Sequence, residues 1–148
     1  MRLQTSAAFL VLALLLTVPP LQAKVLRVDV ASRTTVLDGK VFGDAGAYER
    51  ITGRVYFSLP VANPHNECIV DLGNAVNLKN GEVEFSSDFV AVRPQDVHRG
   101  NGSMLLEVPN RGNPRILSLV DGGDEDLAHD AGDAWLLRSG YTIVSLGW

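Results

Sequence analysis

Between Lys24 and Pro109 the chain repeats one pattern, in which short apolar or alternating runs are separated by turn-forming residues. Alternation of apolar and polar residues, as in residues 54–59, is typical of a strand with one buried face. Asn80-Gly81 between two such runs favours a tight hairpin, because both residues tolerate positive φ. We therefore predict a mostly antiparallel β-rich portion over residues 24–102. The predicted strands are 25–30, 54–59, 68–72, 83–85, 89–93 and 103–108.

The pattern changes after residue 109. A Gly- and Pro-containing loop and an acidic stretch are followed by a short predicted helix, with Asp133 as its N-cap and Gly140 as its stop. Residues 141–146 (YTIVSL) are a continuous run typical of a strand buried on both faces. Strand, loop, helix and strand form a βαβ unit, so the predicted fold class is α/β, with α+β content in this chain. Residues 103–148 are interpreted as the start of an α/β core.

A parallel strand at residues 141–146 needs neighbouring strands and helices to cover it, and an apolar strand is a poor final element. We therefore expect the chain to be a truncated piece of a longer protein. Two alternatives to truncation remain open. In the first, the chain is a small secreted β-rich binding module completed by a partner. In the second, it is a gene remnant with no function.

The first 23 residues have the organisation of a secretory signal peptide. Arg2 supplies a positive charge, residues 7–18 form an apolar run, and Ala23 is a small residue suited to the cleavage position. A membrane anchor would need about 20 apolar residues. We therefore predict export to the periplasm or the exterior, with no membrane attachment after cleavage.

Charge argues against one class of partner. Removing residues 1–23 leaves 125 residues (148 − 23) with 12 Lys and Arg (13 minus Arg2) against 17 acids, a net charge of −5. Nucleic-acid binding relies on Lys and Arg that displace counterions, so we expect no nucleic-acid partner. The single cysteine, Cys68, lies in the apolar run ECIVDL and is expected to be a buried, inert thiol. The oligomeric state is left open.

Metal and cofactor sites are not favoured. The acidic segment 121–133 lacks the spacing of a Ca²⁺ loop, and His129 with Asp133 gives only two ligands, fewer than zinc requires. Gly100-Asn101-Gly102 precedes a strand instead of opening a helix, so turn glycines explain it better than a dinucleotide fingerprint. We therefore expect no metal and no cofactor. The histidines expected at the surface are His65, His98 and His129.

Two features bear on serine hydrolysis. The nucleophile elbow requires Gly-x-Ser-x-Gly, but Ile143 replaces the first glycine before Ser145, which we interpret as an ordinary residue near a strand end. We therefore predict no catalytic residue in this chain. In α/β-hydrolases one oxyanion N–H comes from the loop after an early central strand. The oxyanion-loop candidates are Asn110, Arg111 and Gly112, and an ordinary connection is the alternative.

Seven clusters along the chain resemble the opening of a family of large exported proteins, the alpha/beta hydrolase domain-containing proteins. They are FGDAGAYERITGRV (42–55), VEFS (83–86), VRP (92–94), RGNG (99–102), EVPNRGN (107–113), GDAWL (132–136) and RSGYTIVSLGW (138–148). The resemblance covers nearly all of the mature chain, in order.

The resemblance implies a β-rich N-terminal portion that leads into an incomplete α/β-hydrolase core. It also implies that the segment with the family's expected serine lies beyond Trp148, so only the N-terminal part is present. The parent activity would be serine-dependent hydrolysis of an ester or related acyl bond in a small-molecule substrate, and this chain alone is expected to be inactive. Only Asn110 to Gly112 map onto an expected site, the oxyanion loop.

Overall fold

A computed structural model of the chain describes residues 23–147. The predicted signal peptide lies outside these residues except for Ala23, so export and cleavage stay predictions. Within the part that is described, no helix is long and apolar enough to cross a membrane.

Strands dominate the secondary structure. The strands are β1 (Lys24–Thr35), β2 (Tyr48–Pro60), β3 (Leu78–Lys79), β4 (Glu82–Pro94), β5 (Met104–Glu107) and β6 (Thr142–Leu146). The α-helices are α2 (Ile116–Asp121) and α3 (Trp135–Arg138). Short 3-10 helices are Val36–Gly39, Gly43–Ala45, Pro64–Asn66, Leu72–Asn74, Val97–Arg99 and Asn110–Gly112.

Residues 59–83 belong to a first compact unit. Here β3 pairs antiparallel with the start of β4, and Leu78 lies opposite Val83. Asn80 and Gly81 join them with φ angles of 53° and 78°. Positive φ at both central residues is the requirement of the hairpin turn that Asn-Gly favours, so the predicted hairpin is confirmed.

The predicted strand over residues 68–72 is wrong. This stretch forms turns and the beginning of a 3-10 helix, and Asp71 has a left-handed φ of 58°, which interrupts an extended chain. No described strand pairs with it, so its apolar residues Ile69 and Val70 stay exposed. Cys68 is likewise exposed, which corrects the expectation of a buried thiol.

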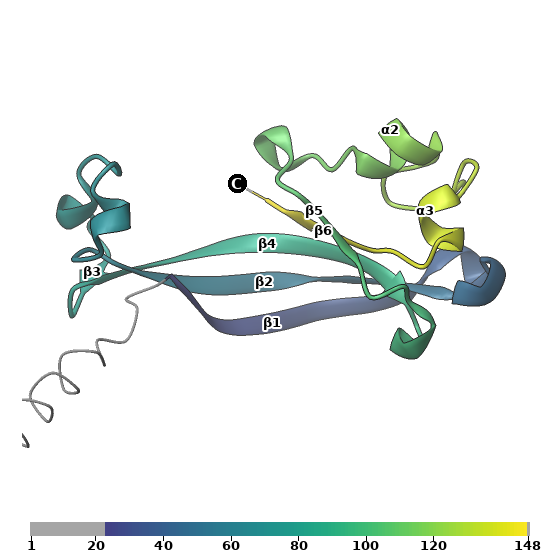
Figure 1. Ribbon diagram of the computed structural model, residues 1–148, viewed down its shortest axis with the longest axis horizontal. Coiled ribbons are helices and arrows are strands. Elements are labelled where there is room, and N and C mark those ends of the chain that lie inside the picture. Colours follow the sequence, from purple (N-terminus) through teal and green to yellow (C-terminus); the bar gives the residue numbers. More distant parts are fainter. Residues whose placement is uncertain (1–22, 148) are drawn as a thin grey trace, which may run out of the picture. The chain divides into compact units, whose positions relative to one another are not determined.

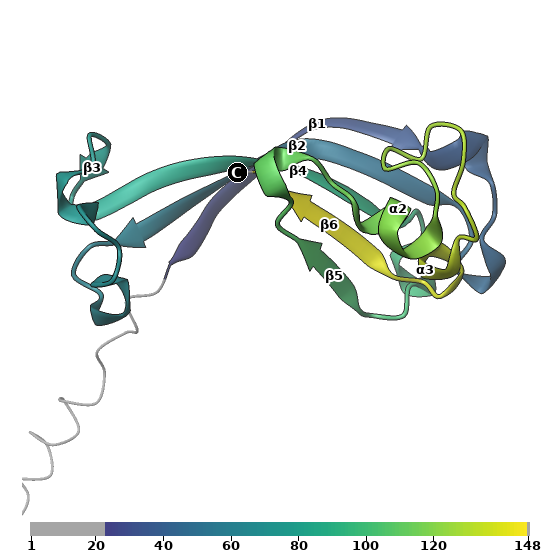
Figure 2. The ribbon, with the colours of Figure 1, turned by 90° about the horizontal axis from the view of Figure 1, so that it is seen from above.

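Residues 25–58 and 84–147 form a second compact unit around the sheet. The strand order is β1-β2-β4-β6-β5. β4 and β6 are antiparallel, whereas β5 and β6 are parallel. In Figure 1 the helices α2 and α3 lie on one side of this sheet, and Figure 2 shows them above β6.

The core lies between this sheet face and the segments that cover it. Val92 and Leu105 both pair with Ile143, so the three side chains share one face, because side chains alternate along a strand. The buried cluster on this face consists of Val36, Phe42, Ala45, Tyr48, Val92, Leu117, Leu127, Ala131, Ala134, Leu136, Leu137 and Ile143.

Tyr48 connects the sheet to α3. Its side chain is fully buried, and its hydroxyl lies 2.9 Å from the carbonyl oxygen of Leu137 and 3.1 Å from that of Tyr141. Its ring meets Phe42 edge-on, with centroids 5.7 Å apart. Burial raises the pKa of Tyr48 to about 12, because the phenolate would lose its hydration. Tyr48 therefore stays a neutral donor that secures the chain on both sides of the α3–β6 turn.

The predicted α/β class is wrong. The structure is β-rich, 41% strand and 23% helical, and among residues 23–147 it has a mixed six-stranded sheet, two short α-helices and no βαβ pattern of an α/β-hydrolase. α2 and α3 have six and four residues, too few to cover a parallel sheet. Glycines at positive φ limit their length, since Gly122 (72°) follows α2 and Gly140 (77°) lies beyond α3.

Several local predictions are nevertheless confirmed. β6 occupies nearly all of the run 141–146, and β5 lies within the run 103–108. The predicted helix exists in shortened form as α3, although its N-cap is Ala134, while Asp133 accepts a hydrogen bond from the Trp135 N–H at 2.9 Å. The runs 83–85 and 89–93 belong to one strand, β4, instead of two.

Candidate functional site

The predicted oxyanion loop forms an exposed 3-10 turn directly after β5. Arg111 and Gly112 have left-handed φ angles of 55° and 74°. The Gly112 N–H donates to the Pro109 carbonyl at 3.2 Å, so this donor already serves the turn. The role of Asn110, Arg111 and Gly112 in an oxyanion hole stays a prediction.

Ser145 pairs with Glu107 across the parallel strands β6 and β5. It is only 5% exposed, and its hydroxyl donates to Oε2 of Glu107 at 3.0 Å. The same carboxylate accepts the N–H groups of Arg115 at 2.9 Å and Ile116 at 3.3 Å. Glu107 thus joins the start of α2 to the sheet, and Ser145 contributes to that connection.

A pocket of about 70 Å³ lies beside this connection, lined by Ser145 and Gly112 among others. Among residues 23–147 no hydrogen bond joins Ser145 to a histidine. His65, His98 and His129 are all exposed, as predicted. The described residues therefore bring Ser145 close to the predicted oxyanion loop but place no histidine base beside it.

The histidine and aspartates of the acidic segment take other partners. His129 Nδ1 lies 3.6 Å from Asp124 Oδ2, whereas Asp133 caps α3, so the pair His129–Asp133 is not formed. In the described range, no group of three or more His, Cys, Asp or Glu side chains could hold a metal ion.

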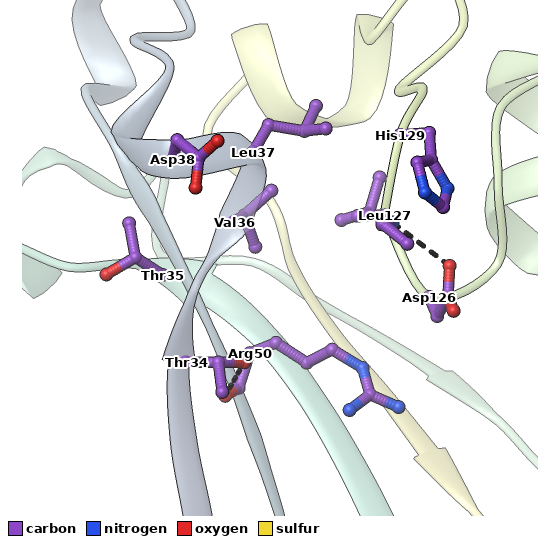
Figure 3. Close-up of a pocket in the computed structure, with 10 residues that line it drawn as sticks. Thr34, Thr35, Val36, Leu37, Asp38, Arg50, Asp126, Leu127 and His129 are labelled. Atoms are coloured by element: carbon purple, nitrogen blue, oxygen red, sulfur yellow. Dashed lines mark hydrogen bonds between the residues drawn. The ribbon is translucent and has the colours of Figure 1, made fainter.

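A second, larger pocket of about 530 Å³ lies between the end of β1 with the turn that follows it, the start of β2 and the acidic loop (Figure 3). Its lining residues are Thr34, Thr35, Val36, Leu37, Asp38, Arg50, Asp126, Leu127, Ala128 and His129. No sequence pattern indicates this pocket, because its lining comes from three separate segments, of which residues 126–129 lie far along the chain from the other two.

Arg50 has an unusual environment in this pocket. Its Nε atom is buried and has no hydrogen-bond partner. Within residues 23–147, no described hydrogen bond or ion pair engages its guanidinium, whereas its backbone carbonyl accepts from the Thr34 hydroxyl at 3.5 Å. Figure 3 shows the guanidinium extended toward the loop that bears Asp126. A buried charged donor without a partner costs free energy.

The alternation of β2 explains why Arg50 lacks a counterion. Its neighbour Glu49 points to the opposite sheet face, because successive side chains of a strand alternate. There Glu49 accepts from Arg93 at 2.7 Å and from Arg33 at 3.1 Å. The nearest acid in sequence is therefore occupied by two other arginines.

Two acids on the pocket wall complete its charge pattern. Asp126 uses Oδ1 to accept the Ala128 N–H at 3.0 Å. Asp38 lies in a turn where Leu37 and Asp38 have left-handed φ angles of 43° and 52°. Such angles cost about 1–2 kcal/mol per residue, and the turn brings Asp38 to the pocket. Neither acid lies within the 4.0 Å ion-pair distance of Arg50 among the described contacts.

Asp121 secures the loop that forms the far wall of the pocket. It is 5% exposed, and its carboxylate oxygens accept the Leu136 N–H at 3.2 and 3.3 Å. Its carbonyl oxygen accepts the Asp133 N–H at 2.9 Å. Burial raises the pKa of Asp121 above its ordinary value, and the Leu136 N–H partly offsets this effect. Both ends of the loop 122–135 are therefore tied to one residue.

Asp121→Asn is expected to be at least as stable as the wild type at pH 7, because Asn removes a buried charge and keeps an acceptor for Leu136. The raised pKa means that the folded chain binds the proton more tightly than the unfolded chain. The cost of the charge is thus present at neutral pH and is lost as pH falls through the raised pKa. Urea denaturation should show the advantage of Asn shrinking as pH falls from 7 to 4. An advantage that grows on acidification contradicts the prediction.

The chain was also compared with known proteins. Comparison with protein-family models, with curated proteins and with solved structures finds no match.

Proposed function

We propose that this chain is a binding module that holds a small carboxylate-bearing ligand through Arg50. The observation that supports the proposal is that Arg50 lines the 530 Å³ pocket with its guanidinium in no ion pair among the described contacts and with its Nε atom buried and unpartnered. Binding sites for small molecules commonly measure about 300–1,000 Å³. The planar guanidinium matches a carboxylate with two parallel hydrogen bonds, and such charge-assisted bonds are about twice as strong as neutral ones.

A ligand carboxylate in the pocket would offset the free-energy cost of the unpartnered Nε–H of Arg50. The Nε–H of Arg50 has lost water without gaining an acceptor, so the ligand would supply the missing partner. Thr34 lines the pocket beside Arg50, where its hydroxyl donates to the Arg50 carbonyl at 3.5 Å. The predicted signal peptide would place this encounter outside the cytoplasm.

Ester hydrolysis is supported less well by the geometry. Hydrolysis by Ser145 needs a base that accepts its proton, usually histidine, and Ser145 instead donates to a carboxylate that also anchors α2. Hydrolysis by Ser145 would also leave the unpaired side chain of Arg50 without a role. Ligand binding in the larger pocket gives that side chain a partner.

The test is an NMR titration of the purified mature chain with 4-methylpentanoate and with its neutral amide, 4-methylpentanamide. We expect the carboxylate to bind and to shift signals of residues 34–38 and 126–129, and the amide to bind at least about tenfold more weakly, the difference expected from a charged hydrogen bond. Arg50→Gln should abolish this preference.

Arg33→Gln is the matched control. It removes one positive charge from the neighbouring strand, and Glu49 keeps Arg93 as a partner. The control should bind 4-methylpentanoate like the wild type. Equal loss in Arg33→Gln and Arg50→Gln would show a nonspecific effect of net charge, and equal binding of acid and amide by the wild type would overturn the proposal.

A further inference from the structure

The charged side chains that line the Arg50 pocket indicate which further groups the ligand carries besides a carboxylate. Arg50 contributes one positive charge, while Asp38 and Asp126 contribute two negative charges, so the lining carries −1 with His129 neutral. A ligand with only a negative charge is attracted by Arg50 but repelled by Asp38 and Asp126. A ligand with only a positive charge is attracted by the two acids but repelled by Arg50. A ligand with one charge of each sign satisfies both walls.

The arrangement of these groups leaves room for such a ligand. In Figure 3, Arg50 reaches in from the sheet, and Asp126 lies on the opposing loop. No ion pair joins Arg50 to Asp126 or Asp38 among the described contacts, so neither acid is in direct contact with the guanidinium. Asp126 uses Oδ1 for the Ala128 N–H, and no described hydrogen bond uses its other oxygen.

An apolar portion of the pocket lies between the charged groups. Val36 and Leu127 belong to the buried core cluster, and Leu37 packs against that cluster. All three line the pocket. Val36 and Leu127 are only 3% and 2% exposed, so Leu37, which is half-buried, provides most of the hydrocarbon surface that a short aliphatic group could contact.

From this pattern we infer that the pocket binds a free amino acid with an aliphatic side chain. Its carboxylate pairs with Arg50, its ammonium group with Asp126 and Asp38, and its side chain packs on Leu37 and Leu127. The inference rests on the proposed function and names the ligand class for the same site.

The test uses ligands that share one isobutyl group. Leucine carries both charges, 4-methylpentanoate lacks the amino group, 3-methylbutylamine lacks the carboxylate, and 2-hydroxy-4-methylpentanoate replaces the amino group with a hydroxyl. NMR titrations of the mature chain should give the tightest binding for leucine. We expect leucine to bind about tenfold or more tightly than either singly charged ligand, the difference that one charged hydrogen bond provides.

Asp126→Asn supplies a second, opposite readout. Asn keeps the Oδ1 acceptor for Ala128, so the loop should keep its fold. Leucine should bind this variant several-fold more weakly, whereas 4-methylpentanoate should bind it more tightly, because a repelling charge is gone. Asp44→Asn is the matched control, since Asp44 is exposed in the turn Gly43–Ala45 and does not line the pocket.

The outcomes separate the inference from the proposed function. If 4-methylpentanoate binds as tightly as leucine and both depend on Arg50, the carboxylate module stands and the amino-acid inference is wrong. If 2-hydroxy-4-methylpentanoate binds as tightly as leucine, a hydroxyl serves Asp38 and Asp126 as well as an ammonium group does, and the inference is again wrong. If no ligand shows dependence on Arg50, both proposals fail. Parallel weakening of leucine and 4-methylpentanoate by Asp126→Asn would indicate a damaged loop and overturn the inference.

Discussion

Replacing Gly132 with alanine is expected to lower the free energy of unfolding by more than about 3 kcal/mol. A Cβ atom at this position would lie 1.8 Å from the carbonyl oxygen of Asp121 and 2.6 Å from its carbonyl carbon. Both are backbone atoms, so relief requires the chain itself to move. Gly132 also has a φ of 57°, which disfavours any side chain. Steric strain at such a position belongs to the few mechanisms that cause large losses.

Gly122→Ala is the matched control for this prediction. Gly122 lies at the other end of the same loop, with a φ of 72°, and a Cβ there would meet no atom within 4 Å. Its substitution should cost only the backbone strain, about 1–2 kcal/mol. Urea denaturation of both variants is followed by circular dichroism. The difference between their losses of unfolding free energy gives the contribution of the steric clash at Gly132. Equal losses would show that Gly132 and Asp121 are not in close contact.

Leu137→Ala is expected to lower the free energy of unfolding by about 3 kcal/mol, within the range of about 2–5 kcal/mol for buried leucine. Leu137 is fully buried in the core cluster, and its carbonyl oxygen accepts the Tyr48 hydroxyl at 2.9 Å. Truncation would leave a cavity between α3 and the sheet. Because domains of this size are stable by about 5–15 kcal/mol, the loss would reduce the folded population measurably on mild heating.

Leu119→Ala provides the comparison, since Leu119 lies on α2 and is 69% exposed. Its loss should stay within about 0.5 kcal/mol, as for ordinary surface positions. Thermal and urea denaturation of the two variants check the prediction. If both cost the same, the cluster under α3 is not the core of the folded chain.

Local chemistry accounts for the predictions that were confirmed. Asn80-Gly81 forms its hairpin because positive φ is needed at two adjacent positions and these residues supply it. The run 141–146 becomes β6 because a continuous β-branched and aromatic segment packs well within a sheet. Such features depend on a few neighbouring residues, which the sequence displays directly.

Interactions between distant residues explain the predictions that were wrong. The run 68–72 has the residues of a strand, but no described neighbour pairs with it and Asp71 takes a left-handed conformation. The α/β prediction interpreted residues 103–148 as a βαβ unit, whereas Glu107 and Asp121 hold a connection with two short helices through their carboxylates. Neither the missing partner strand nor these long-range hydrogen bonds can be read from periodicity.

The features of the candidate site also fall into those that the sequence determines and those that depend on the tertiary structure. The sequence by itself determined the strand-rich character of the chain and the exposure of its histidines. Only the tertiary structure decided that Glu49 is taken by Arg33 and Arg93, that Arg50 is left without a counterion, and that Asp38 and Asp126 meet at the same pocket. The physical reason is that strand propensity depends on neighbouring residues, whereas the pairing of charges depends on which segments the fold brings within a few ångströms of each other.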